Sequence, residues 1–598
     1  MPWLYSLCWE GHNHLPDGNR NATSFANGKE KDMFYGRTNV PFEFELSAGG
    51  RYADISNEVE VDILFRNDQD HTWRVPAFWK GDNRFGVRFA APEPGLYRFE
   101  SVCNCDDPGL HQVGGALSVE LYEGPVPLYR CGRLRVAANR RTLEHTDGTP
   151  FLWLGDTWWM GLSPRLDWPN GFRRLTADRV AKGFNVVQIV AGPYPDFDAK
   201  SDCWNPQQAN EAGWSWEKGW TRINPGYYDL ADLRIVHLVE AGIVPCILAM
   251  WGFYLPCMGV EKVKQHWRNL IARYGAFPVV WCMAGEVNMP TYSLKDDKDG
   301  ERRRRAAAEE QEAGWTEVAR FTKQTDPFRN VITAHPSRPD SREMLKDESL
   351  LDLNMLQTGH GSFHSMRPTV ELVQTSLAKD PPMPTLNGEV CYEGIMGGSL
   401  EDVQRFLFWT SLTDGSAGHT YGAQGIWAMN SRDDPFVGWT SSWGDDFWQD
   451  AMHRPGSTQV GIGKRFLERY PWWLFAPRRE PEAERAGRLS AFATGIPGAV
   501  AIFYLAANWV EDALRGVQGC RIRIEPEAKY EARFFSPATA AETRSYHVRG
   551  GIQVDLGRVL PDEDGFWAVP PKPSMADWVL VLEAPDAFGR ASPVEPRG

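Results

Sequence analysis

The sequence lacks any apolar run long enough to cross a membrane. Nowhere in its 598 residues is there an uninterrupted apolar stretch of the ~18 residues that a membrane-spanning helix requires. The opening residues, 1–10, have neither a basic start nor a sustained apolar core, so we expect no signal peptide. The expectation is a cytoplasmic protein, but a secreted or periplasmic protein trimmed of its leader would give the same sequence.

Basic charge is in deficit. The chain has 64 Lys and Arg against 78 Asp and Glu, a net charge of −14, which disfavours nucleic acid or an anionic membrane as a partner. The one basic run, 302–305, is followed by alanines and glutamates and indicates a solvated helix start. The ten cysteines form no paired CxxC set, so we expect free thiols of a reducing compartment.

Signatures of several other enzyme classes are also missing. No GxSxG occurs, which argues against a serine nucleophile elbow. His335, His360 and His419 come from three different predicted strands and lack the helical spacing of a metal site, so contacts with sugar hydroxyls are favoured over metal ligation. We therefore predict no metal and no cofactor.

Tryptophan is abundant instead. The chain has 26 Trp beside 18 Tyr and 30 Phe. Indole rings fill protein cores, but their faces also stack on the C–H faces of sugars. The surplus is a first indication of a carbohydrate ligand.

Alternating patterns mark the two ends of the chain. Residues 1–35 show little periodicity and are expected to be irregular, whereas 36–124 contain short period-two runs such as Phe42–Leu46 and Val59–Phe65. Such runs, separated by Gly, Pro and Asp, predict an antiparallel β-sandwich. Residues 125–149 read as a linker with a hairpin, and alternation returns at 478–598, where it predicts a second β-sandwich.

The middle of the chain, 150–477, repeats a strand–helix pattern. Helical patterns separate eight short apolar segments: Phe151–Trp158, Asn185–Gly192, Ile243–Gly252, Val279–Asn288, Asn330–Ser337, Leu351–Gly361, Met383–Val390 and Ser416–Gln424. Eight such repeats over about 270 residues predict an α/β fold of the (β/α)8 TIM-barrel type. A doubly wound sheet is the alternative, but no glycine-rich phosphate turn follows the first strand.

Two glutamates stand out at predicted strand ends. Glu286 closes the fourth apolar segment and Glu389 closes the seventh, where an unpaired carboxylate is costly unless it has a function. Strands 4 and 7 face each other across a barrel mouth, so both groups are expected to flank one bond. Carboxylates ~5–5.5 Å apart give retaining glycoside hydrolysis, and a pair ~6.5–9.5 Å apart gives inversion. A buried network with arginine is the structural alternative.

Other polar and aromatic residues at the strand ends are candidate substrate contacts. They are Asp156, Trp158, Gln188, Trp251, Asn288, His335, His360, Tyr392, His419, Tyr421 and Gln424. For Asp156 a role in fixing the first loop is an equal alternative. The long loops 193–225 and 425–456 are rich in tryptophan and predict walls that close a cleft into a pocket for a chain end, unless these rings anchor the loops.

Four ordered blocks carry a resemblance to a known family. Gly155–Trp159, Lys182–Gln188, Asn387–Glu393 and Ala417–Gly422 resemble the apiosidase-like glycoside hydrolases, family 140 and its relatives, over about residues 145–475. The N-terminal sandwich resembles the accessory domain before such barrels. The C-terminal one resembles a domain described as collagen-binding, a label we do not carry over as a function.

The resemblance implies a retaining (β/α)8 barrel with Glu389 as the nucleophile and Glu286 as the acid/base. The chain departs from the family at strand 4, where apiosidases carry an aspartate acid and the wider superfamily has Asn before a glutamate. Here Gly285 precedes Glu286, and Asn288 is the candidate replacement for the lost contact.

These observations predict a retaining, exo-acting glycosidase that takes a carbohydrate substrate, and a homo-oligomer stays open. A non-catalytic carbohydrate-binding protein on the same scaffold is the main alternative, followed by a metal-dependent enzyme. Neither nucleic acid nor a membrane is an expected partner.

Overall fold

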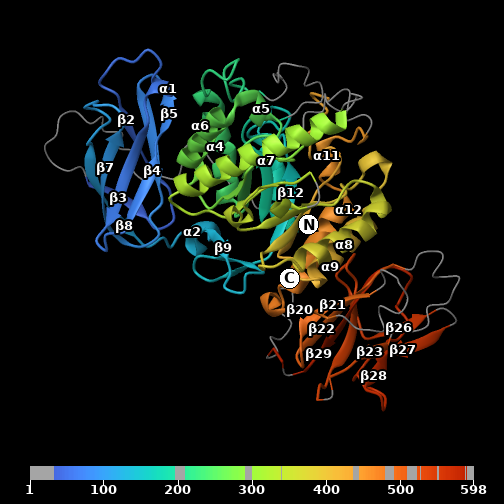
Figure 1. The fold of residues 1–598 in the computed structure, drawn as a ribbon. Coiled ribbons are helices and arrows are strands. Elements are labelled where there is room, and N and C mark those ends of the chain that lie inside the picture. The colour runs from blue at the N-terminus through green and yellow to red at the C-terminus, as the bar shows by residue number, and fades with distance from the viewer. Residues whose placement is uncertain are drawn as a thin grey trace, which may run out of the picture. The chain divides into compact units, whose positions relative to one another are not determined.

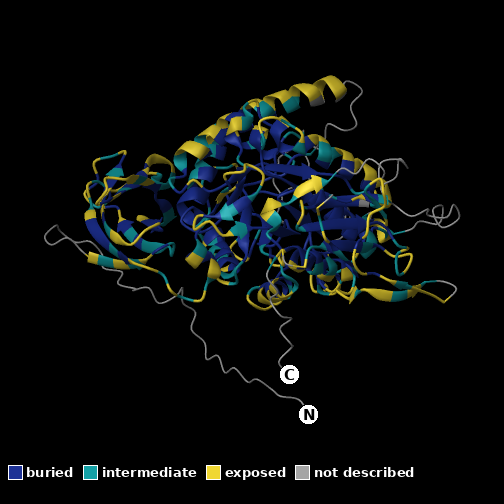
Figure 2. Cartoon of the chain, turned by 90° about the horizontal axis from the view of Figure 1, so that it is seen from below, coloured by how far each residue is buried: buried dark blue, intermediate teal, exposed yellow. Residues whose placement is uncertain are grey.

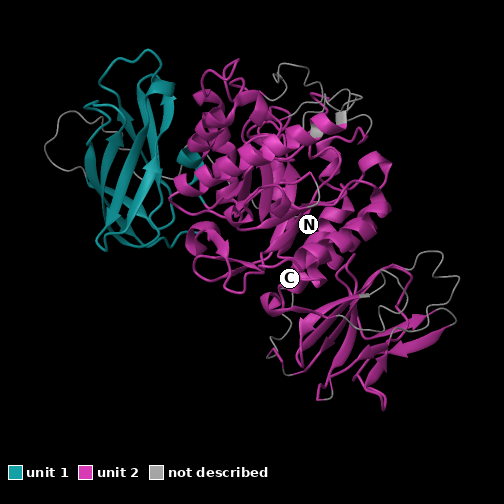
Figure 3. Ribbon diagram, in the orientation of Figure 1, with its two compact units in different colours: residues 1–125, 271–277 teal, residues 126–270, 278–598 magenta. Residues whose placement is uncertain are grey.

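The computed structural model describes residues 33–194, 209–289, 300–337, 340–435, 443–478, 491–507, 521–525, 527–548, 551–585 and 587–588. The chain divides into two compact units, residues 1–125 with 271–277 and residues 126–270 with 278–598 (Figure 3). Within the described ranges, none of the helices is long and apolar enough to span a bilayer.

The first unit is built from two facing β-sheets (Figure 1). Its elements are β1 (Met33–Arg37), β2 (Phe42–Ser47), α1 (Ile55–Glu58), β3 (Val61–Asn67), β4 (Thr72–Pro76), β5 (Phe78–Gly81), β6 (Arg84–Phe89), β7 (Gly95–Cys103) and β8 (Gly114–Glu120). One sheet has the order β1-β8-β7-β3-β4 and the other β2-β6-β5. The pairing is antiparallel as predicted, except that β1 runs parallel to β8.

Phenylalanines join the two sheets of this unit. Phe65 on β3 stacks on Phe89 of β6 with ring centroids 4.0 Å apart, and Phe44 on β2 lies 4.9 Å from Phe99 on β7. These residues occupy alternate positions on their strands, so the period of two places them on the inner faces. The result is the sandwich-like arrangement that the alternation predicts.

The second unit begins with α2 (Pro127–Cys131) and a small antiparallel sheet of β9 (Leu134–Val136), β10 (Leu143–His145) and β11 (Pro150–Phe151). Eight parallel strands follow. They are β12 (Trp153–Trp158), β13 (Val186–Val190), β14 (Val244–Leu248), β15 (Val280–Cys282), β16 (Ile332–Thr333), β17 (Asn354–Gln357), β18 (Thr385–Glu389) and β19 (Gly418–Tyr421).

Each of these strands falls inside one of the eight predicted segments, and all of their residues are buried (Figure 2). Their order is β16-β15-β14-β13-β12-β19-β18-β17, which leaves only β16 and β17 unpaired. The backbone N–H groups of Asp352 and Leu353 donate to Ile332 O across this gap and nearly close the barrel. The predicted (β/α)8 architecture is confirmed.

Helices surround the strands. They are α3 (Asn170–Lys182), α4 (Pro225–Glu240), α5 (Tyr254–Met258), α6 (Val260–Tyr274), α7 (Gly300–Thr325), α8 (Met366–Leu377), α9 (Glu401–Thr413), α11 (Trp448–Ala451) and α12 (Pro455–Leu467). Between β16 and β17 the described residues form only two 3-10 turns, η3 (Ser341–Glu343) and η4 (Glu348–Leu350), where the repeat predicts a helix.

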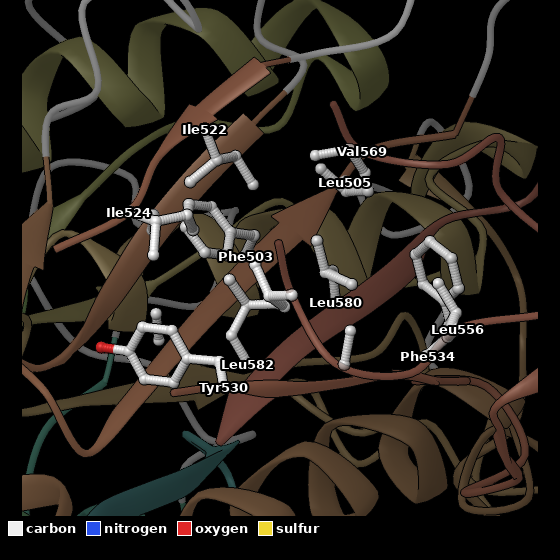
Figure 4. Close-up of a cluster of buried hydrophobic side chains, with 14 residues drawn as sticks. Phe503, Leu505, Ile522, Ile524, Tyr530, Phe534, Leu556, Val569, Leu580 and Leu582 are labelled. Atoms are coloured by element: carbon white, nitrogen blue, oxygen red, sulfur yellow. The ribbon is translucent and has the colours of Figure 1, made fainter. Parts of the chain in front are cut away.

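The C-terminal part is a second β-structure. Its strands are β20 (Ala476–Arg478), β21 (Ala491–Ile496), β22 (Val500–Leu505), β23 (Arg521–Arg523), β24 (Glu531–Phe535), β25 (Glu542–Thr543), β26 (Ser545–Val548), β27 (Ile552–Asp555), β28 (Phe566–Ala568) and β29 (Trp578–Glu583). Six form an antiparallel sheet in the order β20-β21-β22-β29-β24-β25. One face of this sheet packs a core around Phe503, Phe534 and Leu580 (Figure 4).

The other face of this sheet covers α9. Arg405 on α9 forms a bidentate ion pair with Asp577, at 2.8 and 2.7 Å, and Tyr504 Oη donates to the same carboxylate. Trp409 of α9 stacks on Tyr504 with centroids 6.0 Å apart. Only 9% of the Arg405 side chain and 2% of the Asp577 side chain is exposed, so both charges depend on each other.

We expect Asp577→Ala to lower the free energy of unfolding of this unit by about 3–5 kcal/mol, because it leaves the Arg405 guanidinium buried without its carboxylate. Urea denaturation followed by circular dichroism measures the loss. Glu371→Ala is the matched control, since its pair with Arg367 on α8 is exposed and such a pair contributes about 0.3–0.5 kcal/mol. Equal effects of the two substitutions would contradict the buried-pair account.

The cysteines follow the expectation of free thiols with one exception. Cys103, Cys105, Cys131, Cys246, Cys282 and Cys391 are free. Cys257 is instead disulfide-bonded, so the expectation is wrong at that position.

Candidate active site

Glu286 and Glu389 lie at the carboxyl-terminal end of the barrel. Glu389 is the last residue of β18, and Glu286 follows β15 by four residues. Glu286 has φ +44°, a left-handed conformation that a residue with a Cβ adopts only under strain. Strained backbone of this kind concentrates at functional sites, where the surrounding structure holds it in place.

Two imidazoles hold the Glu389 carboxylate. His335 Nε2 lies 2.9 Å from Oε2, and His360 Nε2 lies 2.8 Å from Oε1. Burial alone would raise the pKa of Glu389, but hydrogen bonds and charges of the two histidines outweigh it and hold this pKa well below its usual range. Glu389 is therefore ionised.

His360 is the protonated partner of this group. Burial alone would lower the pKa of His360, yet hydrogen bonds with Cys391 and Glu389 raise it to about 9. The ring of Tyr392 lies 4.6 Å from the His360 ring, and the Trp159 indole donates to Tyr392 Oη at 3.1 Å. A buried ion pair of His360 and Glu389, walled by aromatic rings, results.

Glu286 has the opposite electrostatic environment. Its pKa is raised, first by burial and then by the negative charge of Glu389, while His335, Trp251 and Gln357 offset part of the effect. Trp251 Nε1 donates to Oε2 at 3.1 Å, and Gln357 Nε2 donates to Oε1 at 3.3 Å. Glu286 therefore holds its proton to a higher pH than an exposed glutamate.

Shared neighbours link the two carboxyl groups. Gln357 pairs with Glu389 in the β17–β18 ladder while its side chain reaches Glu286. His335 contacts the Glu389 carboxylate through Nε2, and its Nδ1 accepts from the backbone N–H of Glu286 at 3.4 Å. The negative charge of one group therefore acts on the proton affinity of the other.

The glycine before Glu286 has a steric cause. A Cβ built on Gly285 would lie 2.1 Å from Cε3 and Cζ3 of the Trp251 indole, which is 4% exposed. The family's asparagine therefore has no space at position 285, because Trp251 occupies it. In its place the Trp251 indole N–H reaches the carboxyl of Glu286.

We expect Gly285→Ala to destabilise the protein by about 1–3 kcal/mol through this overlap. Combined with Trp251→Ala, which empties the space, the two losses should be less than additive. Urea denaturation of both single variants and the double variant measures the coupling. Gly557→Ala is the control, since nothing lies within 4 Å of its added Cβ. Fully additive losses would contradict the steric account.

The structure brings only some of the predicted candidates to the carboxyl groups. Trp251, His335, His360 and Tyr392 surround them, and Asn288 lies two residues after Glu286, where it accepts from Ser337 Oγ. Gln357 and Trp159 were not selected from the sequence, although both stand at strand ends, and the position at a strand end was the available signal.

Three candidates have no atom left for a substrate. Asp156 is fully buried, and its carboxylate accepts from Arg179 Nε at 2.6 Å, from Trp158 Nε1 and from the backbone of Thr157. Of its two alternatives, the structure matches the one in which Asp156 fixes the first loop. Trp158 is engaged by this bond, and Tyr421 Oη donates to Glu393 at 2.5 Å. Substrate contact is therefore corrected for all three.

Three further candidates stay inside the fold. Gln188 Nε2 donates to Gly388 O, beside the nucleophile candidate. Gln424 accepts from the indole of Trp427 and donates to Gly444 O. His419 is fully buried against Phe408, and burial lowers its pKa to about 3. These groups support the barrel wall rather than face its mouth.

No group of three or more His, Cys, Asp or Glu side chains in the described part of the chain is arranged to hold a metal ion. His335 and His360 meet at the carboxylate of Glu389, whereas His419 lies in the barrel wall. The three histidines therefore do not converge.

The tryptophans of the two long loops differ in position. In the first loop, Trp216 is buried and donates to His266 Nδ1 at 3.0 Å, so it anchors the loop. In the second, Trp448 donates to Arg165 O, while Trp443 lies 5.2 Å from the His360 ring. Trp204 and Trp439 lie outside the described residues.

Comparison with known proteins agrees with this geometry. The family described as "Apiosidase-like, catalytic domain" matches residues 137–474, which is more than half of the chain, and a domain of unknown function (DUF5060) matches residues 39–104. No curated protein matches the chain.

Solved structures show the same fold. One, titled "Glycoside hydrolase", has 22% identity and a TM-score of 0.59 and covers 77% of this chain and 99% of its own. A glycoside hydrolase family 5 structure from Bacteroides vulgatus has 23% identity and a TM-score of 0.58, with coverages of 77% and 95%. Together with the family match over the barrel and its strand-end carboxyl groups, these findings show that the chain belongs to the apiosidase-like family of glycosidases.

Proposed function

We propose that this glycosidase acts with retention of configuration, with Glu389 as the nucleophile and Glu286 as the general acid and base. The observation that carries the proposal is the opposite shift of the two pKa values. Glu389 is held ionised by His335 and His360, and Glu286 is held protonated by burial and by the charge of Glu389. A pair of carboxyl groups whose environments separate their pKa values divides the roles of base and acid between them.

The first step forms a covalent intermediate. The Glu389 carboxylate attacks the anomeric carbon while Glu286 gives its proton to the departing glycosidic oxygen, so the C–O bond of the substrate breaks as the ester bond forms. Trp251 and Gln357 hold the Glu286 carboxyl through one hydrogen bond to each oxygen. These contacts fix the direction in which the proton is delivered.

The second step reverses the roles. Esterification removes the negative charge of Glu389, and with it one of the two causes that raise the pKa of Glu286. Glu286 then loses its proton more readily and accepts one from water, whose oxygen attacks the anomeric carbon and releases Glu389. The sugar leaves with the configuration that it had in the substrate.

The alternative of a non-catalytic binding protein predicts carboxylates engaged by arginine. Glu389 is engaged by imidazoles instead, and the strained Glu286 has a raised pKa. A structural ion-pair network does not need such a separation of proton affinities. The geometry therefore favours catalysis.

Exo action on a chain end is the second part of the proposal. It rests on Trp443, whose half-buried ring lies beside His360 and 6.5 Å from Trp427 at the edge of the site. An aromatic wall at this edge restricts the mouth to a terminal sugar of an oligosaccharide or glycoside. The buried Trp216 supplies no such wall on the side of the first loop.

Product analysis tests both parts. We expect a panel of nitrophenyl glycosides to identify the accepted sugar, and proton NMR of the early product to show a free monosaccharide of retained anomeric configuration. Oligosaccharides of that sugar should shorten by one residue at a time. Early release of mixed oligosaccharides would contradict exo action, and an inverted first product would contradict retention.

A further inference from the structure

A cavity of about 410 Å³ lies at the opposite end of the barrel from the two carboxyl groups. Its lining includes Leu152, which immediately precedes β12, and Ser416, two residues before β19. Because all eight strands are parallel, these amino-terminal ends lie away from Glu286 and Glu389. The volume falls within the ~300–1,000 Å³ of small-ligand sites.

One side of this cavity is aromatic. The turn η7 (Trp472–Leu474) places Trp472 and Trp473 in the lining, with ring centroids 6.0 Å apart and planes at 89°. The Trp473 residue is 38% exposed. Two indoles at right angles present a wall and a floor that fit the C–H face and the edge of one sugar ring.

The facing side is polar and balanced in charge. Arg141, from the turn between β9 and β10, donates to Leu377 O at the end of α8. Asp414, after α9, accepts from Gln374 Nε2 at 3.0 Å. One cation and one anion line the same cavity, so a neutral ligand with many hydroxyl groups matches it better than an ionic one.

Ser416 supplies the observation that points to a ligand. It is 6% exposed and lines the cavity, and its hydroxyl has no hydrogen-bond partner among the residues that the structure describes. A buried hydroxyl without a partner costs about 1–3 kcal/mol. A ligand hydroxyl in the cavity would satisfy it.

We propose that this cavity is a second carbohydrate-binding site, which holds one neutral sugar ring of a glycan through Trp472, Trp473 and Ser416. The class of ligand rests on the proposed function, whereas the cavity takes no part in the reaction. It would hold a polymer on the enzyme at a place remote from the cleaved end.

Affinity electrophoresis of the full chain carrying Glu389→Gln tests this site. The gels contain soluble arabinoxylan, galactomannan or mixed-linkage β-glucan, with anionic polygalacturonate for comparison. Such polymers offer many internal rings and few ends, so an exo-acting catalytic site contributes little to retardation. We expect retardation by at least one neutral polymer and none by polygalacturonate.

Variants in the same background assign the retardation to the cavity. Trp472→Ala should raise the dissociation constant about tenfold or more, and Ser416→Ala should raise it several-fold with little change in shape. Leu474→Ala is the control, since this neighbour is 60% exposed and lies outside the lining. Passage of the Glu389→Gln chain through every neutral gel without retardation, or equal retardation of all variants, would overturn the proposal. Loss of catalysis by the parent enzyme would leave this readout unchanged, so the two proposals fail separately.

Discussion

Replacing Glu389 with Gln is expected to lower kcat/KM for aryl glycosides by roughly 10⁴-fold or more, the scale on which an enzyme loses activity with its nucleophile. The amide keeps the shape of the side chain but cannot form the glycosyl ester. Stopped assays with the nitrophenyl glycoside that the wild-type enzyme accepts measure the loss.

A second readout shows that the variant is folded and altered as intended. The carboxylate is one of the causes that raise the pKa of His360 to about 9, so this pKa should fall in Glu389→Gln, which NMR titration of the imidazole detects. Glu371→Gln, the same change on the exposed face of α8, should keep wild-type activity. Full activity of Glu389→Gln would remove Glu389 from the mechanism.

Glu286→Ala should have the second-largest effect, and its size should depend on the leaving group. General acid catalysis contributes about 10²–10⁴-fold, so a substrate with a poor leaving group should lose that much in kcat/KM. A dinitrophenyl glycoside needs no proton and should keep most of its first step. Azide should then restore turnover by attacking the intermediate, and NMR should show a glycosyl azide of retained configuration.

The pH profile of the wild-type enzyme is the control for this assignment. The acid must be protonated in the free enzyme, so activity is present below the raised pKa of Glu286 and is lost as the pH rises through it. This alkaline limb should be absent for Glu286→Ala acting on the dinitrophenyl glycoside. A glycosyl azide of inverted configuration would exchange the roles of Glu286 and Glu389.

The strand pattern could be predicted from sequence because each barrel strand is buried on both faces. A strand such as β13 or β14 then becomes a short continuous apolar run between turn signals, which is visible without any partner. The absent helix between β16 and β17 was not visible, since the repeat alone predicts one. Nor was the parallel pairing of β1 with β8, because alternation fixes the faces of a strand but not its neighbour.

The site was predictable only in part for a similar reason. Glu286 and Glu389 are charged residues at the ends of apolar strands, and burial of a charge needs an explanation even in one dimension. Asp156 gives the same signal, yet in three dimensions Arg179 of α3 neutralises it. Sequence cannot distinguish a catalytic carboxylate from one paired with an arginine on another element.

The sequence by itself determined the eight-strand barrel, the two flanking β-structures, and the pair of glutamates at the strand ends. These follow from hydrophobic periodicity and from the cost of burying charge, which act along the chain. Only the tertiary structure decided which glutamate is ionised, why Gly285 must precede Glu286, and where the cavity beside Trp472 lies. Those features depend on His335, His360 and Trp251 and on segments far apart in the chain, and their distances and electrostatic effects exist only once the barrel has closed.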